Sequence, residues 1–151
     1  MQVLTVSKVK IKRPIAEVYH FVVNMENFGQ WFPEVINIQS ANAIEHGLVG
    51  KKYLETVKVP FQGEQQISLE VVAAKKNELF MTEGEFHPLL PRMTVNFSAD
   101  FENNTNLTWR MESRSNNSLF NILLLPIFKA ILKKRAKKGV QSLKGILEKE
   151  S

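Results

Sequence analysis

Residues 128–148 read FKAILKKRAKKGVQSLKGILE, and this stretch decides the fold of the chain. At about 100° per residue, a helical plot gathers its apolar side chains on one broad face. These side chains are Phe128, Ile131, Leu132, Ala136, Leu143, Ile146 and Leu147. Lysines occupy the opposite face. An amphipathic helix of this length needs an apolar surface to cover, so the rest of the chain must provide one.

Three residues interrupt the pattern of the helix predicted over residues 117–148. Pro126 lacks a backbone donor and its ring crowds the preceding turn, so we expect the helix to kink or restart there. The apolar segment 119–125 would then precede a basic amphipathic one. Gly139 lies near the middle of the apolar stripe and costs about 1 kcal/mol relative to alanine. It either permits close packing on the sheet or leaves room for a ligand. Arg135 lies inside the edge of the stripe.

The composition indicates one globular domain, residues 1–151, with 44% hydrophobic and 23% charged residues. This length is enough to bury about two-thirds of the unfolded surface in a single core. Because the chain has no cysteine, disulfides, thiolate metal sites and cysteine nucleophiles are excluded. The first residues do not resemble a signal peptide, and the longest apolar run is far shorter than the ~20 residues that span a bilayer. We therefore expect a cytoplasmic protein.

The net charge of +5 is concentrated in residues 129–138, which carry six basic residues and no acid. The basic side chains mainly occupy one helix face and lack interleaved aromatic or glycine-rich elements, so we expect a solvated face and no nucleic-acid partner. A peripheral contact with an anionic membrane is the alternative. Its basic residues would be Lys129, Lys133, Lys134, Lys137 and Lys138.

Upstream of this helix the hydrophobic period is mostly two, which is typical of antiparallel strands. A first strand is predicted over residues 2–12, followed by short helices over 15–23 and 25–32. Six further strands are predicted over 35–42, 51–59, 65–75, 78–86, 92–101 and 106–114, separated by glycine, proline and asparagine turns. Short links join antiparallel neighbours, so these strands predict a meander.

Alternation within the strands places apolar residues on one face of the sheet. Met93, Val95, Phe97, Ala99 and Phe101 share a face, as do Leu107, Trp109 and Met111. A curved sheet with one apolar face must be covered, and the long C-terminal helix is the only predicted element large enough.

Four segments, taken in this order, resemble one known fold family. They are residues 12–19 (KRPIAEVY), 27–35 (NFGQWFPEV), 105–112 (TNLTWRME) and 143–148 (LKGILE). Together they resemble the START-like or SRPBCC superfamily, also called birch-pollen-allergen-like, and within it the bacterial polyketide cyclase/dehydrase-like members. The resemblance implies an α+β helix-grip fold, in which a curved seven-stranded antiparallel sheet wraps around a long C-terminal helix and two short helices follow the first strand.

The same resemblance implies a hydrophobic cavity between sheet and helix. We expect it to bind a small hydrophobic ligand such as a lipid, an isoprenoid or an aromatic polyketide. Two alternatives remain: a polyketide cyclase/dehydrase-type enzyme, and a quinone or lipid chaperone that docks on anionic membranes. The protein would be a monomer or a homodimer. The candidate ligand-binding residues are Phe28, Trp31, Phe32, Tyr53, Met81, Phe97, Trp109, Met111, Phe128, Leu132, Arg135 and Gly139.

Polar chemistry is sparse in the sequence. Arg135 would extend its charged group to water, pair with Glu55 or Glu85, or meet an anionic ligand group. If the protein is an enzyme, Arg135, Glu55 or Tyr53 would assist proton transfer. The motif Glu17-x-x-His20 lacks a second copy, so we expect no metal and no cofactor. A nucleophile elbow and a glycine-rich phosphate loop are also absent, and no catalytic residue can be assigned.

Overall fold

The computed structural model describes residues 1–149 and contains one seven-stranded antiparallel sheet. The strands are β1 (Gln2–Ile11), β2 (Val35–Ser40), β3 (Lys52–Val59), β4 (Gly63–Lys75), β5 (Leu79–Glu85), β6 (Pro91–Ala99) and β7 (Thr105–Ser113). Their order in the sheet is β1-β7-β6-β5-β4-β3-β2. The meander predicted from the alternating residues is therefore confirmed, and β1 pairs with the last strand of the meander.

The helices lie where the sequence predicts them. They are α1 (Ile15–Val23), the short 3₁₀ helix η1 (Met25–Gln30), α2 (Ser118–Leu123) and α3 (Leu125–Lys149). The Asn24 side chain accepts a hydrogen bond from the Glu26 amide at the start of η1. The Asn117 side chain accepts one from the Phe120 amide at the start of α2. Both asparagines satisfy amide groups that a helix start leaves unpaired.

The predicted restart of the C-terminal helix is confirmed, but it begins before the proline. The interruption falls at Leu124, and Pro126 is the second residue of α3. Proline is well suited to this position because the first-turn amides of a helix have no intrahelical acceptor. α3 then continues without a break to Lys149 and passes through Gly139.

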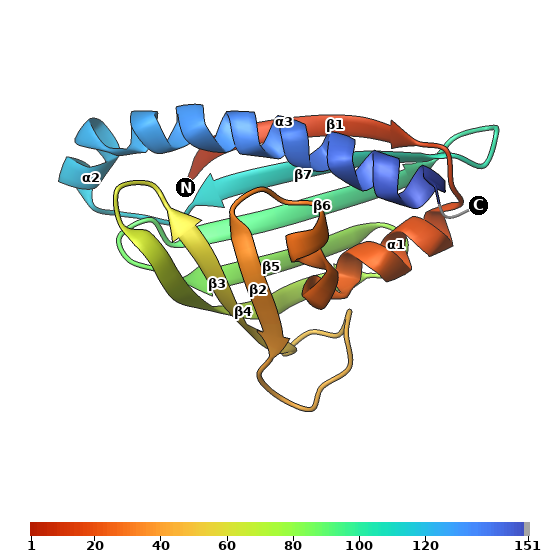
Figure 1. Cartoon of the computed structure of the whole chain (residues 1–151), viewed down its shortest axis with the longest axis horizontal. Coiled ribbons are helices and arrows are strands. Elements are labelled where there is room, and N and C mark those ends of the chain that lie inside the picture. The colour runs from red at the N-terminus through yellow and green to blue at the C-terminus, as the bar shows by residue number, and fades with distance from the viewer. Residues whose placement is uncertain (150–151) are drawn as a thin grey trace.

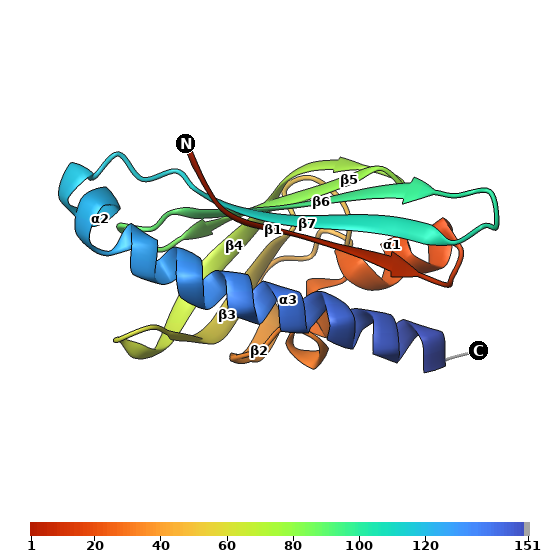
Figure 2. The ribbon, with the colours of Figure 1, turned by 90° about the horizontal axis from the view of Figure 1, so that it is seen from above.

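Figure 1 shows α3 extending beside β1, with α1 and η1 near its C-terminal half. Figure 2 shows α2 and the start of α3 at one end of the molecule and α1 at the other. The buried face of α3 consists of Leu125, Phe128, Leu132, Ala136, Gly139, Val140, Leu143 and Leu147. Val140 extends the stripe expected from the sequence, while Ile131 and Ile146 lie at its partly exposed margins.

Two expected inward positions are wrong. Phe101 does not continue β6; it lies in the β6–β7 turn and is fully exposed. Met81 occupies the outer face of β5, because its neighbours Phe80 and Thr82 are buried inward and side chains alternate along a strand. The prediction of a ligand-facing Met81 is therefore corrected.

Within residues 1–149, no helix is both long and apolar enough to cross a membrane.

Candidate functional site

A cavity of about 90 Å³ lies between the sheet and the first half of α3. An adjoining space of about 50 Å³ continues it under η1, and the two share the lining residues Phe28, Glu55, Pro91 and Met111. The walls come from η1, β2, β3, β4, β6, β7, the β5–β6 loop and α3. The larger space is lined by Phe28, Phe32, Val35, Glu55, Val57, Lys58, Val59, Pro60, Ile67, Phe86, Leu89, Pro91, Met111, Phe128, Leu132 and Arg135.

Strand alternation explains how β3 supplies one wall. Tyr53, Glu55, Val57 and Val59 are successive residues of one face, so all four point toward the concave side of the sheet. Three of these positions carry apolar or aromatic side chains, as the inner face of a sheet requires. The fourth, Glu55, places a carboxyl group on the wall shared by both spaces of the cavity.

Glu55 is only 8% exposed. Within the described part of the chain, its carboxyl group has no hydrogen bond or salt bridge to another side chain. Burial raises its pKa from the ordinary value of 4.5 to about 7, because removing a carboxylate from water disfavours the charged form. Glu55 is therefore a proton donor or acceptor near neutral pH inside a mainly apolar cavity.

Arg135 lies at the rim of the cavity and does not pair with Glu55 or Glu85. Its Nη1 donates a hydrogen bond to the carbonyl oxygen of Lys58, at 2.9 Å. Partial burial lowers the pKa of Arg135, and the nearby Glu34 opposes this change. Of the alternatives for Arg135, pairing with a carboxylate of the sheet is therefore wrong: Arg135 ties α3 to the end of β3.

The structure brings half of the candidate ligand-binding residues to the cavity. These are Phe28, Phe32, Met111, Phe128, Leu132 and Arg135. Trp31, Trp109 and Gly139 instead belong to the packed region under the C-terminal half of α3. Trp109 is fully buried and stacks on Phe32 with ring centroids 5.0 Å apart. Its indole nitrogen is buried and has no acceptor among the described residues.

Gly139 serves close packing rather than ligand space. A β-carbon added there would lie 3.0 Å from Cδ2 of Phe32 and 3.4 Å from the carbonyl oxygen of Trp31. These distances are those of tight packing, so no ligand fits between Gly139 and the aromatic residues below it. Of the two explanations that the sequence left open for this glycine, the contacts support packing.

Tyr53 and Phe97 are buried but lie outside the cavity wall. The Tyr53 hydroxyl lies 2.6 Å from Nδ1 of His46, whose Nε2 lies 3.4 Å from a carboxylate oxygen of Glu26. Burial raises the pKa of Tyr53 to about 12. Phe97 packs edge-on against Tyr19 of α1, at 5.1 Å between ring centroids. Both residues fasten loops and helices to the sheet.

The contribution of Leu89 could not be predicted from the sequence. This residue of the β5–β6 loop lines the cavity, but the loop has no helical or strand period from which a buried face could be inferred. Glu55 was a candidate only as a partner for Arg135 or as an aid to proton transfer. Its isolation in the cavity depends on the tertiary structure.

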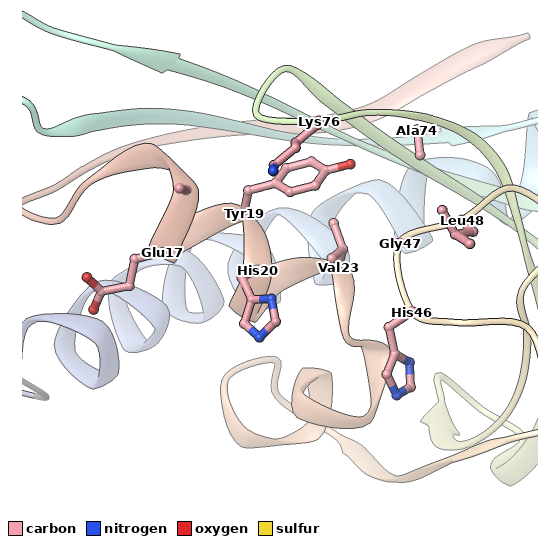
Figure 3. A pocket seen from close by; sticks show the side chains of 10 residues that line it. Glu17, Tyr19, His20, Val23, His46, Gly47, Leu48, Ala74 and Lys76 are labelled. Carbon is pink, nitrogen blue, oxygen red and sulfur yellow. The ribbon is translucent and has the colours of Figure 1, made fainter.

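A larger and more open hollow of about 660 Å³ lies between α1 and the β2–β3 loop. Glu17, His20 and His46 border it, but Figure 3 shows that their side chains do not converge on a common point. In residues 1–149 no group of three histidine, aspartate or glutamate side chains is placed to hold a metal ion. The less open and more apolar cavity with Glu55 is therefore the better candidate site.

A covered concave sheet with an internal cavity under a C-terminal helix defines the helix-grip class, and solved structures agree. A START superfamily protein from Mycobacterium smegmatis has a TM-score of 0.78 at 13% identity, covering 97% of this chain and 98% of that one. A Polyketide_cyc-like protein from Corynebacterium glutamicum has a TM-score of 0.66 at 19% identity, covering 99% and 94%.

The di-domain ARO/CYC protein StfQ of the steffimycin biosynthetic pathway has a TM-score of 0.76 at 10% identity. The match covers 99% of this chain and 52% of StfQ, so the chain spans about half of that protein. No family profile and no curated protein sequence matches the chain. At these identities the likeness shows the fold: the predicted START-like helix-grip architecture is confirmed.

Proposed function

We propose that this protein binds a small apolar molecule, or the apolar end of a larger one, in the cavity between the sheet and the first half of α3. The observation that carries the proposal is a partly open apolar cavity with one buried, unpaired carboxyl group, Glu55. Apolar walls supply affinity through buried area, and a single polar group supplies orientation. The START and polyketide cyclase-like folds of its structural neighbours support a ligand-binding role.

The cavity chemistry narrows the ligand class. A space of about 90 Å³ accommodates a ring or a short branched chain, and longer parts would extend past Arg135 and Lys58 at the rim. A protonated Glu55 donates a hydrogen bond to a carbonyl or ether oxygen, whereas an ionised Glu55 accepts one from a hydroxyl or amine. Lipids, isoprenoids and aromatic polyketides all carry an apolar body with such an oxygen. A cytoplasmic location remains part of this proposal.

Native mass spectrometry of freshly purified protein, followed by solvent extraction, tests the proposal. We expect one apolar ligand molecule (the passenger) bound to each protein chain. Leu132→Phe fills the cavity and should remove the passenger. Leu48→Phe makes the same change in the hollow beside α1 and should retain it. Loss of the passenger in Leu48→Phe alone would place binding in the other hollow and contradict the proposal.

A second function, a polyketide cyclase/dehydrase-type activity, is favoured by one specific observation. The pKa of Glu55 lies near 7, which suits a group that both accepts and donates a proton at neutral pH. Tyr53 is less suited because its hydroxyl is engaged by His46 and its pKa is raised to about 12.

An aromatic or dehydrated product from a poly-β-carbonyl substrate, detected by mass spectrometry, would support the enzyme. Glu55→Gln should then abolish turnover while the substrate still binds. If the unaltered protein binds the poly-β-carbonyl substrate but does not convert it, the enzyme function is contradicted and only the binding function remains.

A further inference from the structure

The outer side of α2 and of its link to α3 is a surface of large aliphatic side chains. Leu119 is 69% exposed, Ile122 72% and Leu123 59%, and Leu124 and Ile127 are also exposed. Phe120 alone turns inward from α2, where it packs on Phe128 with ring centroids 5.6 Å apart. Five exposed aliphatic residues within nine positions form a contiguous patch rather than scattered surface residues.

A second exposed apolar residue lies at the same end of the molecule. Phe61, in the β3–β4 turn, is 76% exposed. Figures 1 and 2 both place this turn and α2 at one end, opposite α1. The cavity opens at this end as well, since Lys58 and Pro60 before the turn and Phe128 of α3 line it. Exposed apolar groups therefore flank the cavity mouth on two sides.

Basic residues continue this surface along α3. Helical geometry places Lys134 and Lys138 within about 20° of Ile127 around the helix axis, so all three share one outer line. Both lysines are exposed, and residues 129–138 contain no acid. The apolar patch thus borders a row of uncompensated positive charge. An interfacial membrane-binding helix has these two features: its apolar side chains enter the boundary of the acyl chains, and its lysines contact the lipid phosphates.

We propose that residues 119–127, Phe61, Lys134 and Lys138 form a docking surface for an anionic phospholipid bilayer, with the cavity mouth turned toward it. The positive charge of α3 indicates which partner covers this surface. A second copy of this chain would bring two basic helices together, whereas an anionic bilayer neutralises them and covers the aliphatic groups. The ligand would then be a membrane-resident amphiphile that enters the cavity directly, a consequence that rests on the proposed function.

Cosedimentation with vesicles tests the electrostatic part. We expect the full chain to bind phosphatidylcholine vesicles that contain phosphatidylserine at low salt, and to bind less as salt screens the charges. Lys134→Gln with Lys138→Gln should weaken binding about 25-fold, at about fivefold per lysine. Lys75→Gln with Lys76→Gln removes the same charge at the far end of β4, and binding should equal that of the unaltered protein.

Serine substitutions test the apolar part. Phe61→Ser, and Ile122→Ser with Leu123→Ser, should each weaken vesicle binding about tenfold or more. Phe101→Ser is the matched control, because Phe101 is even more exposed than Phe61 but lies in the β6–β7 turn at the opposite end. All these side chains are exposed, so the variants should fold, and circular dichroism verifies this.

Three results would overturn the docking surface. The first is failure to bind anionic vesicles at low salt, and the second is equal loss in the far-end controls. The third is a dimer that forms without lipid and dissociates when Ile122→Ser and Leu123→Ser are introduced together. That result would assign the surface to a second copy of the chain. Leu132→Phe separates the two proposals, since it should dock normally without a passenger. If the protein docks on vesicles but never carries a bound ligand, the proposed function is refuted and the docking surface stands. If it carries a ligand but does not dock, the docking surface is refuted and the proposed function stands.

Discussion

The two halves of α3 cover the same sheet in different ways. Under the C-terminal half, Gly139 brings the helix backbone close to Phe32, which stacks on Trp109, and no α3 residue beyond Arg135 lines the cavity around Glu55. Under the N-terminal half, Phe128 and Leu132 line a cavity around Glu55. The same helix–sheet interface therefore has a tightly packed part and a part with space for a ligand. The packed half should carry stability, and the open half should carry pH dependence and ligand binding.

Trp109→Ala should produce the largest loss of stability. Trp109 is fully buried and stacked on Phe32, so its removal leaves a large cavity in the packed half and costs about 3–5 kcal/mol. Urea unfolding followed by circular dichroism measures the loss. Met111→Ala is the comparison in the open half, where the lost side chain already borders a cavity, and it should cost clearly less. Equal losses would show that the two halves are not distinct.

Glu55→Gln should stabilise the protein at alkaline pH. The folded pKa of about 7 exceeds the unfolded value near 4.5, so this carboxyl group favours the folded state fully below pH 4.5. That advantage is lost as pH rises from 4.5 through 7. We therefore expect the variant to match the unaltered protein near pH 4 and to exceed its free energy of unfolding by up to about 3 kcal/mol at pH 8.

Asp100→Asn is the control of opposite sign for this pH experiment. A hydrogen bond and ion pair with Lys10, together with backbone amides, lower the pKa of Asp100 to about 2. Its stabilising effect is present above the unfolded pKa and is lost as pH falls toward 2, so the variant should be less stable than the unaltered protein at neutral pH. A Glu55→Gln difference that stays constant with pH would contradict a buried, titrating carboxyl group.

Enlarging a side chain should be tolerated in one half and costly in the other. Leu132→Phe adds atoms toward the open cavity and should change stability by less than about 1 kcal/mol. Ala136→Leu adds atoms where the side chain is fully buried and should cost about 1–3 kcal/mol. Thermal unfolding of both variants measures the contrast. A larger loss in Leu132→Phe would mean that the cavity wall is rigid.

Much of the fold could be predicted from the sequence, because period and turn chemistry are local signals. They predicted the meander, the helix restart near Pro126 and the buried stripe that contains Phe128 and Leu132. The cavity itself was not predictable in detail, since it depends on distances between segments far apart in the chain. Leu89 lies in a loop without a period, and the isolation of Glu55 depends on where Arg135 reaches. Met81 was wrong because the assumed face of β5 was the outer one.

Gly139→Ala should have a small effect on stability and tests whether close approach to Phe32 explains the tight packing under the C-terminal half of α3. Helix propensity favours alanine by about 1 kcal/mol. The new methyl group would lie 3.0 Å from Phe32, whose ring is confined by stacking on Phe28 and Trp109 and cannot yield freely. We expect the clash to exceed the propensity gain and leave a net loss of about 1 kcal/mol. Gly145→Ala is the matched control, because a methyl group there meets nothing within 4 Å and should stabilise the same helix. If both substitutions stabilise equally in urea unfolding, the approach of α3 to Phe32 is not what closes this half of the interface.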